Sequence, residues 1–136
     1  MKVIEGRITS GFGDRVHPIT GQKSFHNGID IAAVVGTAIY SPIDGVVVDV
    51  YDREIGGKSL IIGDKNTLRF GFAHLSKVIV KIGDQITKKQ LIAKSGNTGI
   101  STGPHLHFTA KTGGRWVGST YVGGQFVDSE PYLIIK

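Results

Sequence analysis

The chain has 136 residues, enough for one domain with a buried core and too few to expect two, so we predict a single domain over residues 1–136. It contains no cysteine, which excludes disulfide scaffolds, thiolate zinc sites and thiol nucleophiles; any metal must be held by nitrogen and oxygen. Sixteen basic against eleven acidic residues give a net charge of +5, which favours an anionic partner. The basic residues are scattered with few aromatics between them, which disfavours nucleic acid.

The sequence contains no segment that suggests membrane insertion or secretion. No apolar run approaches the ~20 residues that a membrane-spanning helix needs. The first residues, MKVIEGRITSGFGDR, lack the apolar stretch of a secretory signal. We therefore expect a protein that acts where it is made, leaves the cell by another route, or is a piece of a longer secreted parent.

Short apolar runs rich in Val, Ile and aromatic residues follow one another between glycine-containing turns, which is typical of β-strands. In chain order the runs cover residues 38–52, 58–64, 68–75, 77–84, 90–96, 105–111 and 130–136. No stretch of ten or more residues has helical periodicity. The predicted fold is mostly β, with antiparallel strands forming a β-sandwich or partly closed barrel. A faint similarity between SPIDGVVVDV and VKIGDQITKKQLIAKSG fits a duplicated unit, although it is too weak to count as a repeat.

The region after the 105–111 run is rich in glycine. We interpret residues 111–136 as a glycine-rich connection followed by a last strand. Its aromatic residues Trp116, Tyr121 and Phe126 are predicted to pack rather than to bind a ligand.

Histidines mark three of the expected strands or their ends. FHNGID places His26 and Asp30 four positions apart, and GFAHLS places His74 at the end of an apolar run. In GPHLHF, His105 and His107 are two positions apart, so on a strand both rings point to the same face. An exposed strand face with half-solvated histidines is the alternative. The fifth histidine, His17 in VHPITG, is interpreted as a loop residue.

This residue set matches the demands of a catalytic zinc site. Such a site takes three protein ligands from histidine and carboxylate and leaves a fourth position for water, whose pKa the metal lowers. A nearby imidazole can then accept the water's proton or stabilise an oxyanion. A serine triad is disfavoured because no serine lies in a GxSxG turn.

With these motifs in place, the chain resembles the lysostaphin-like (LytM-type) zinc metallopeptidases, which cleave peptide bonds in bacterial peptidoglycan. The resemblance covers residues from about 10 to 109 and rests on GFGDRVHPITG, on the HxxxD of FHNGID, on GFAHLS and on the HxH of GPHLHF. It implies that His26, Asp30 and His107 bind one Zn²⁺ and that His74 and His105 are catalytic. The implied activity is a zinc endopeptidase that hydrolyses a cross-bridge or stem peptide through a metal-activated water.

The chain also departs from this family. Thr109 follows the HLHF run where the family often has glutamate, and Phe72 stands where it often has tyrosine. Residues 111–128 follow the family poorly, and we expect them to form a loop at the edge of the groove. None of these positions is an implied zinc ligand, so we expect differences in substrate fit rather than loss of activity.

The resemblance implies action on the cell wall, with the peptidoglycan peptide as substrate and an anionic wall polymer as a possible further partner. The motifs begin close to the first residue. We therefore keep two interpretations of the chain: a phage-type lysin that is delivered by other means, or a domain of a longer secreted protein. A different class is a non-catalytic domain of the same fold that binds wall or activates a hydrolase. Sugar phosphotransferase IIA proteins are another alternative, but they leave HxxxD unexplained. The oligomeric state and the bond cleaved stay open.

Overall fold

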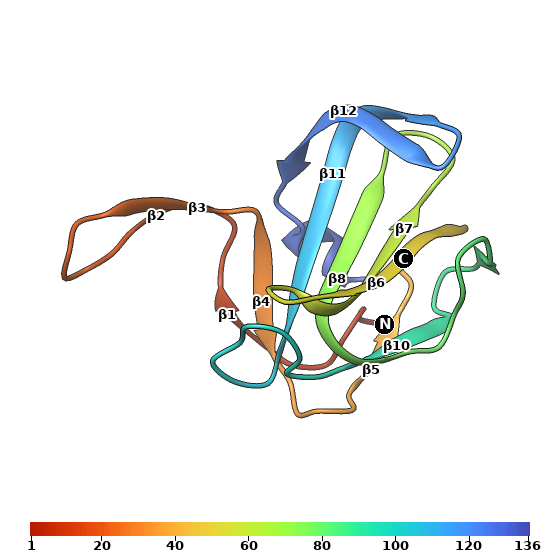
Figure 1. Ribbon diagram of the computed structural model, residues 1–136. Helices are drawn as coiled ribbons and strands as arrows, with labels where there is room; N and C mark the ends of the chain where they lie inside the picture. Colours follow the sequence, from red (N-terminus) through yellow and green to blue (C-terminus); the bar gives the residue numbers. More distant parts are fainter.

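A computed structural model describes all residues 1–136, and nearly all of its regular structure is strand (Figure 1). No helix in it has the length and apolar character needed to cross a bilayer. The strands are β1 (Arg7–Ser10), β2 (Gly13–Val16), β3 (Lys23–His26), β4 (Gly28–Ala32), β5 (Ala38–Tyr40), β6 (Gly45–Arg53), β7 (Gly57–Gly63), β8 (Arg69–Val78), β9 (Gln85–Ile86), β10 (Leu91–Ser95), β11 (His105–Val117) and β12 (Thr120–Val127), followed by the 3₁₀ helix η1 (Glu130–Leu133).

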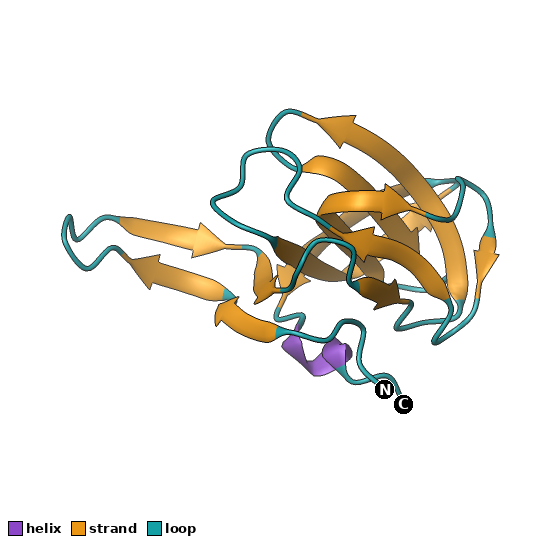
Figure 2. Ribbon diagram, turned by 90° about the horizontal axis from the view of Figure 1, so that it is seen from below, coloured by secondary structure: helices purple, strands orange, loops and turns teal.

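The strands form one large antiparallel sheet and one small hairpin. The ten-stranded sheet has the order β1-β4-β11-β8-β7-β6-β9, with β12 paired to β11 and with β10 joining β5 to β8. Strands β2 and β3 form a separate two-stranded sheet that projects from the body (Figures 1 and 2). The prediction of a mostly β, antiparallel fold is confirmed. The large sheet curves but does not close into a barrel, and the predicted internal duplication stays a prediction.

The central strands alternate between a buried face and an open face. On β11, Leu106, Phe108 and Ala110 are fully buried, while His105 and His107, which alternate with them, point the other way. Phe108 stacks on Phe70 and Phe72 of β8, with ring centroids 5.7 and 5.2 Å apart. Each such aromatic side chain contributes ~1.5–3 kcal/mol by burial. Because a shift of one residue would put both histidines into this core, packing fixes which face they occupy.

The two ends of the chain complete the core. The backbone N–H of Val3 donates to the carbonyl of Leu133 at 2.8 Å, and the side chains of Val3 and Ile135 are buried. Buried Ser129 donates its hydroxyl to the carbonyl of Phe108 at 2.8 Å, which ties the start of η1 to β11. The N- and C-termini therefore lie side by side, as Figure 2 shows.

The region after His107 differs from its prediction. We expected a glycine-rich connection and an edge loop, but β11 continues to Val117 and pairs with β12 as a long hairpin. The last strand that we expected over 130–136 is also wrong, because Glu130–Leu133 form the 3₁₀ helix η1. Gly118 makes the two-residue turn possible, because its φ of +61° is in the left-handed region. At Gly114 a side chain would meet the ring of Tyr121 at 2.5 Å, so this glycine allows the aromatic residue to lie over the strand. Glycines here permit pairing rather than interrupt it.

Candidate metal centre and its groove

Four strands bring the candidate residues together on the open face of the sheet. His26 ends β3, Asp30 lies on β4, and His105 and His107 lie on β11. In the antiparallel register, His107 is directly opposite Asp30 on one side and Ala73 of β8 on the other. Since His74 follows Ala73, this register places Asp30, His74, His105 and His107 within one small region. His26 joins them because β3 leads directly into β4.

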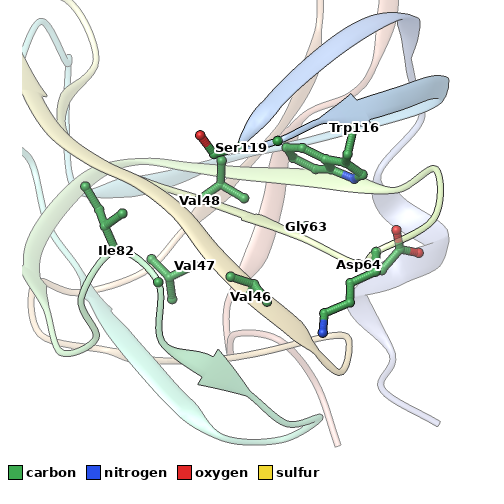
Figure 3. A pocket seen from close by; sticks show the side chains of 11 residues that line it. Val46, Val47, Val48, Gly63, Asp64, Ile82, Trp116 and Ser119 are labelled. Carbon is green, nitrogen blue, oxygen red and sulfur yellow. The ribbon is translucent and has the colours of Figure 1, made fainter.

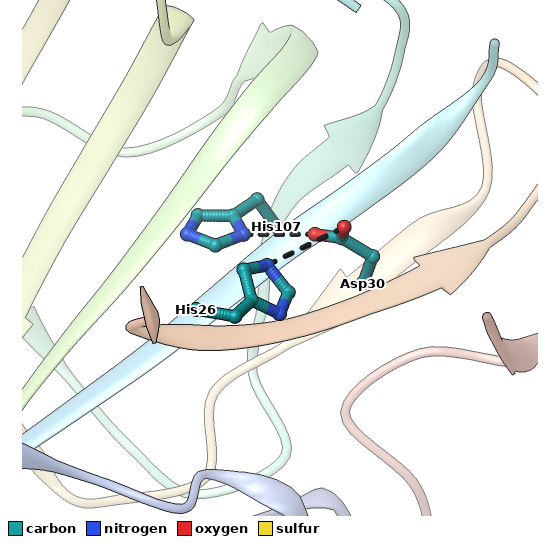
Figure 4. A group of neighbouring side chains, drawn as sticks. All are labelled: His26, Asp30 and His107. Carbon is teal, nitrogen blue, oxygen red and sulfur yellow. Dashed lines mark hydrogen bonds and ion pairs between the residues drawn. The ribbon is translucent and has the colours of Figure 1, made fainter. Parts of the chain in front are cut away.

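His26, Asp30 and His107 form a compact group whose nitrogen and oxygen atoms could hold a metal ion, shown in Figure 4. One potential ligand atom from each lies within 4.8 Å of the others. Nε2 of His26 is 3.4 Å from Oδ2 of Asp30, and Nδ1 of His107 is 2.8 Å from Oδ1 of the same carboxylate. Two imidazoles and one carboxylate are the donor set that catalytic zinc takes from proteins, so these residues fit the metal.

The far nitrogen of each ligand ring is held by an oxygen acceptor. Nδ1–H of His26 donates to the carbonyl of Gly11 at 2.7 Å, which leaves Nε2 to face Asp30. Nε2–H of His107 donates to Oδ1 of Asn27 at 2.8 Å, which leaves Nδ1 to face Asp30. Such partners fix both the ring orientation and the tautomer of metal-binding histidines. The two rings therefore present their free nitrogens to one point.

Asp30 is ionised in this setting. Burial by itself would raise the pKa of Asp30, but the contact with His107 and the nearby imidazoles of His26 and His105 outweigh it and hold the pKa below its ordinary value. The carboxylate is thus available as an anionic ligand across the neutral range.

His74 and His105 form a second pair beside this group. Their ring centroids are 4.6 Å apart, and the ring of His74 is 6.4 Å from that of His107. Nδ1–H of His74 donates to the carbonyl of Thr98 at 2.7 Å, and Nδ1–H of His105 donates to that of Gly103 at 2.8 Å. Both rings therefore keep Nε2 free for chemistry.

The backbone and the burial of His74 are unusual. Its φ of +62° is in the left-handed region, which is uncommon for a residue other than glycine and is often found at functional sites. Burial lowers the pKa of His74; the hydrogen bond to Thr98 opposes this shift, and the neighbouring His105 and His107 add to it. His74 is therefore neutral at pH 7 and able to accept a proton.

The histidines lie in an open groove made of two adjoining hollows. The first, of about 370 Å³, contains His26, Asp30, His74, His105 and His107, with the exposed side chains of Ile55 and Ile100 at its rim. The second, of about 170 Å³, shares Ala73 and His107 with the first and continues over β8 and β11 to Tyr51, Arg69 and Phe126. An extended peptide can thus pass over His107 and rest on the sheet beyond it.

A separate hollow of about 410 Å³ lies against β6, beside the turn between β11 and β12 (Figure 3). It is lined by Val46, Val47, Ile82 and Trp116, whose Nε1 is buried without a hydrogen-bond partner. It contains no histidine and only one carboxylate, from Asp64, so it lacks the donors of a zinc site.

The structure brings together all five residues that the sequence singled out for the site. His17 lies apart, in the turn between β2 and β3, where its Nδ1 accepts hydrogen bonds from the backbone N–H groups of Ile19 and Thr20. Of the two departures from the family, Phe72 is buried in the core and Thr109 lines the groove. The predicted packing of Trp116 on Tyr121 is seen as an edge-on contact with ring centroids 4.9 Å apart.

Sequence reasoning missed the residues that hold the histidine rings: Asn27, Gly11, Thr98 and Gly103. Gly11, Thr98 and Gly103 act through backbone carbonyls, for which a sequence carries no signal. Asn27 directly follows His26, and its polar side chain beside a candidate ligand was a signal that could have been used.

The fold and the site define a class: an antiparallel β protein with a two-histidine, one-aspartate metal-binding group in an open groove. The sequence model of Peptidase family M23 matches residues 24–119, and the chain belongs to this family. The resemblance to LytM-type peptidases is thereby confirmed.

Relatives in sequence and in structure agree with this assignment. The chain is 43% identical over 110 residues to the peptidoglycan DD-endopeptidase ShyA of Vibrio cholerae, an alignment that covers 80% of this chain and 26% of ShyA. It superposes on LytU with a TM-score of 0.76 and 40% identity, covering 94% of this chain and 84% of LytU. It superposes on the catalytic domain of the antimicrobial peptidase lysostaphin from Staphylococcus simulans with a TM-score of 0.77 and 29% identity, covering 94% and 92% of the two chains. The chain spans about a quarter of the length of curated relatives such as ShyA.

Proposed function

We propose that this chain is a zinc-dependent endopeptidase that hydrolyses peptide bonds in bacterial peptidoglycan, in the cross-bridge or the stem peptide. One observation carries the proposal: a His26, Asp30 and His107 metal-binding group lies beside the paired rings of His74 and His105 in a single groove. Membership of Peptidase family M23 and the names of ShyA and lysostaphin support the substrate class.

In this proposal His26, Asp30 and His107 hold one Zn²⁺ per chain. The ion, when bound, supplies Lewis acidity and lowers the pKa of a coordinated water toward neutrality. The ligand rings are held in place by the Gly11 carbonyl and the Asn27 side chain, so little reorganisation accompanies binding.

His74 and His105 handle protons in this scheme. Each keeps its Nε2 free because its Nδ1–H is bound to a backbone carbonyl. Neutral His74 can accept the proton released as water attacks the scissile carbonyl carbon. A protonated Nε2 of the pair then stabilises the developing oxyanion and delivers a proton to the leaving amine. For both rings to act on one scissile bond, they must lie next to each other. The 4.6 Å separation of their centroids is consistent with this requirement.

The wider setting is also part of the proposal. Residues 1–136 act as one peptidase domain, which the packing of Val3 and Ile135 into one core supports. Action on the cell wall follows from the proposed substrate, and the net charge of +5 favours accumulation on anionic wall polymers. Delivery as a phage lysin stays a prediction from the sequence.

Metal content and activity, measured on one preparation, test the function. We expect about one zinc per chain, with clearing of purified peptidoglycan that is lost on chelation and restored by zinc. His26→Ala should lose both zinc and activity, while His17→Ala, which removes a histidine outside the site, should keep both. Zinc without clearing would contradict the proposed substrate, and a chain with neither property would support the non-catalytic wall-binding domain.

A further inference from the structure

Arg69 is the one residue among lysines, arginines and carboxylic acids that lines the second hollow of the groove. The hollow is otherwise lined by apolar and polar side chains, among them Tyr51, Thr109 and Phe126. Arg69 begins β8, and Gly71 and Ala73 follow it on the same open face of the sheet. The guanidinium of Arg69 therefore lies at one end of the groove, and the metal-binding group of His26, Asp30 and His107 lies toward the other end.

The guanidinium of Arg69 has no partner within the protein. No ion pair or hydrogen bond joins its side chain to another residue, although the side chain is half-buried. Burial lowers the pKa of Arg69 and the nearby Tyr51, Tyr121 and Asp49 oppose the shift, but an arginine stays protonated at neutral pH. Because no carboxylate lies within ion-pairing distance, the hydrogen-bond donors of the guanidinium are free to bind an anionic ligand.

The spacing suits a peptide that crosses the metal-binding group. Ala73 is opposite His107 in the register, and Arg69 lies four residues further along β8, about 13 Å away at the rise of a strand. An extended peptide advances by a similar step per residue, and the Arg69 side chain covers part of the gap. A group about two to four residues from the scissile bond can therefore reach the guanidinium.

We propose that Arg69 is a specificity-determining residue that binds a free carboxylate of the substrate peptide about two to four residues from the scissile bond. The inference rests on the proposed function and narrows it to acidic peptides. A planar guanidinium donates two parallel hydrogen bonds to a carboxylate, and no carboxylate of the protein lines this hollow to compete with the ligand. Both a side-chain carboxylate and a C-terminal carboxylate have this chemistry.

The test compares matched substrates. The shortest cross-linked peptide from peptidoglycan that the zinc-loaded protein cleaves is prepared with its carboxylates free, with only the side-chain carboxylate converted to carboxamide, and with only the C-terminal one converted. We expect kcat/KM to fall about tenfold or more when the recognised carboxylate is amidated. The two single conversions show which carboxylate is recognised.

Arg69→Gln should remove this preference, lowering kcat/KM for the free-carboxylate peptide mainly through KM and leaving the amidated peptide within about twofold. Arg115→Gln is the matched control, because Arg115 is exposed near the end of β11 and its loss changes the net charge equally. A preference that survives in Arg69→Gln, or that Arg115→Gln removes as well, overturns the inference.

Zinc content and thermal midpoint are measured for each variant. If Arg69→Gln does not fold, Arg69→Lys decides, since it keeps the charge but not the bidentate geometry; we expect a clearly reduced preference, and an unchanged one overturns the inference. If the proposed endopeptidase function itself is wrong, the zinc-loaded wild-type chain will cleave none of the peptides. That result is distinct from the loss of the carboxylate preference alone. Equal cleavage of all three by the wild type would leave the function intact and refute the role of Arg69.

Discussion

The side chain of Asn27 accepts a hydrogen bond from Nε2 of His107 at 2.8 Å, on the side of the ring opposite Asp30. This contact decides which nitrogen of His107 is free for a metal. Asn27→Leu should therefore lower zinc affinity by about 10- to 100-fold, because the ring loses its orientation and tautomer. Competition for zinc with a coloured chelator measures the change directly.

Asn27→Asp keeps an oxygen acceptor and should retain tight zinc binding. Asn66→Leu is a control in an exposed loop remote from the histidines. If Asn27→Leu binds zinc as tightly as the Asn66→Leu control, the contact has no role in metal binding.

The pH dependence of stability should carry a signature of His74. Burial lowers its pKa in the folded chain below the ordinary value of 6.5, so the unfolded state binds more protons between these two values. Stability then rises with pH across that window, and the contribution of neutral His74 is lost as pH falls below about 6.5.

Thermal midpoints of the metal-free wild type and of His74→Gln, measured from about pH 5 to about pH 8, check this. The wild type should lose stability relative to the variant as the solution is acidified. Parallel curves would mean that His74 titrates alike in the folded and unfolded chains.

The core under the site should be sensitive to truncation. Phe108 is fully buried between Phe70 and Phe72, so Phe108→Ala should lower the free energy of unfolding by about 3–5 kcal/mol. Arg115→Ala, on the exposed end of the same strand, should change it by less than about 0.5 kcal/mol. Denaturant unfolding measures both; similar losses in the two variants would contradict the packing described for β11.

Local patterns in the sequence were enough to predict the main features of the site. Alternation along residues 105–111 fixed the face of His105 and His107, and the HxxxD spacing placed His26 beside Asp30. The partners of these rings were not predictable, because Gly11 and Thr98 contribute backbone carbonyls whose position depends on the complete fold.

The β11–β12 hairpin was missed for a different reason. Glycine pairs normally indicate turns, and residues 113–114 and 123–124 both read as breaks. In the folded chain Gly114 is opposite Gly123, and the strands pair across them because Tyr121 packs over the space that side chains would fill. The sequence around each glycine pair does not show that the glycines make room for Tyr121, because this depends on which strand pairs with β11.

Attraction to the anionic wall should respond to salt. The net charge of +5 is spread over the surface, so screening at higher ionic strength should weaken wall binding. We expect sedimentation of the protein with purified cell walls to fall between about 0.05 M and about 0.5 M salt, together with the rate of wall clearing. Cleavage of a small uncharged peptide should change little over the same range, because long-range attraction does not contribute to it. Wall binding that does not vary with salt would show that accumulation depends on specific contacts instead of net charge.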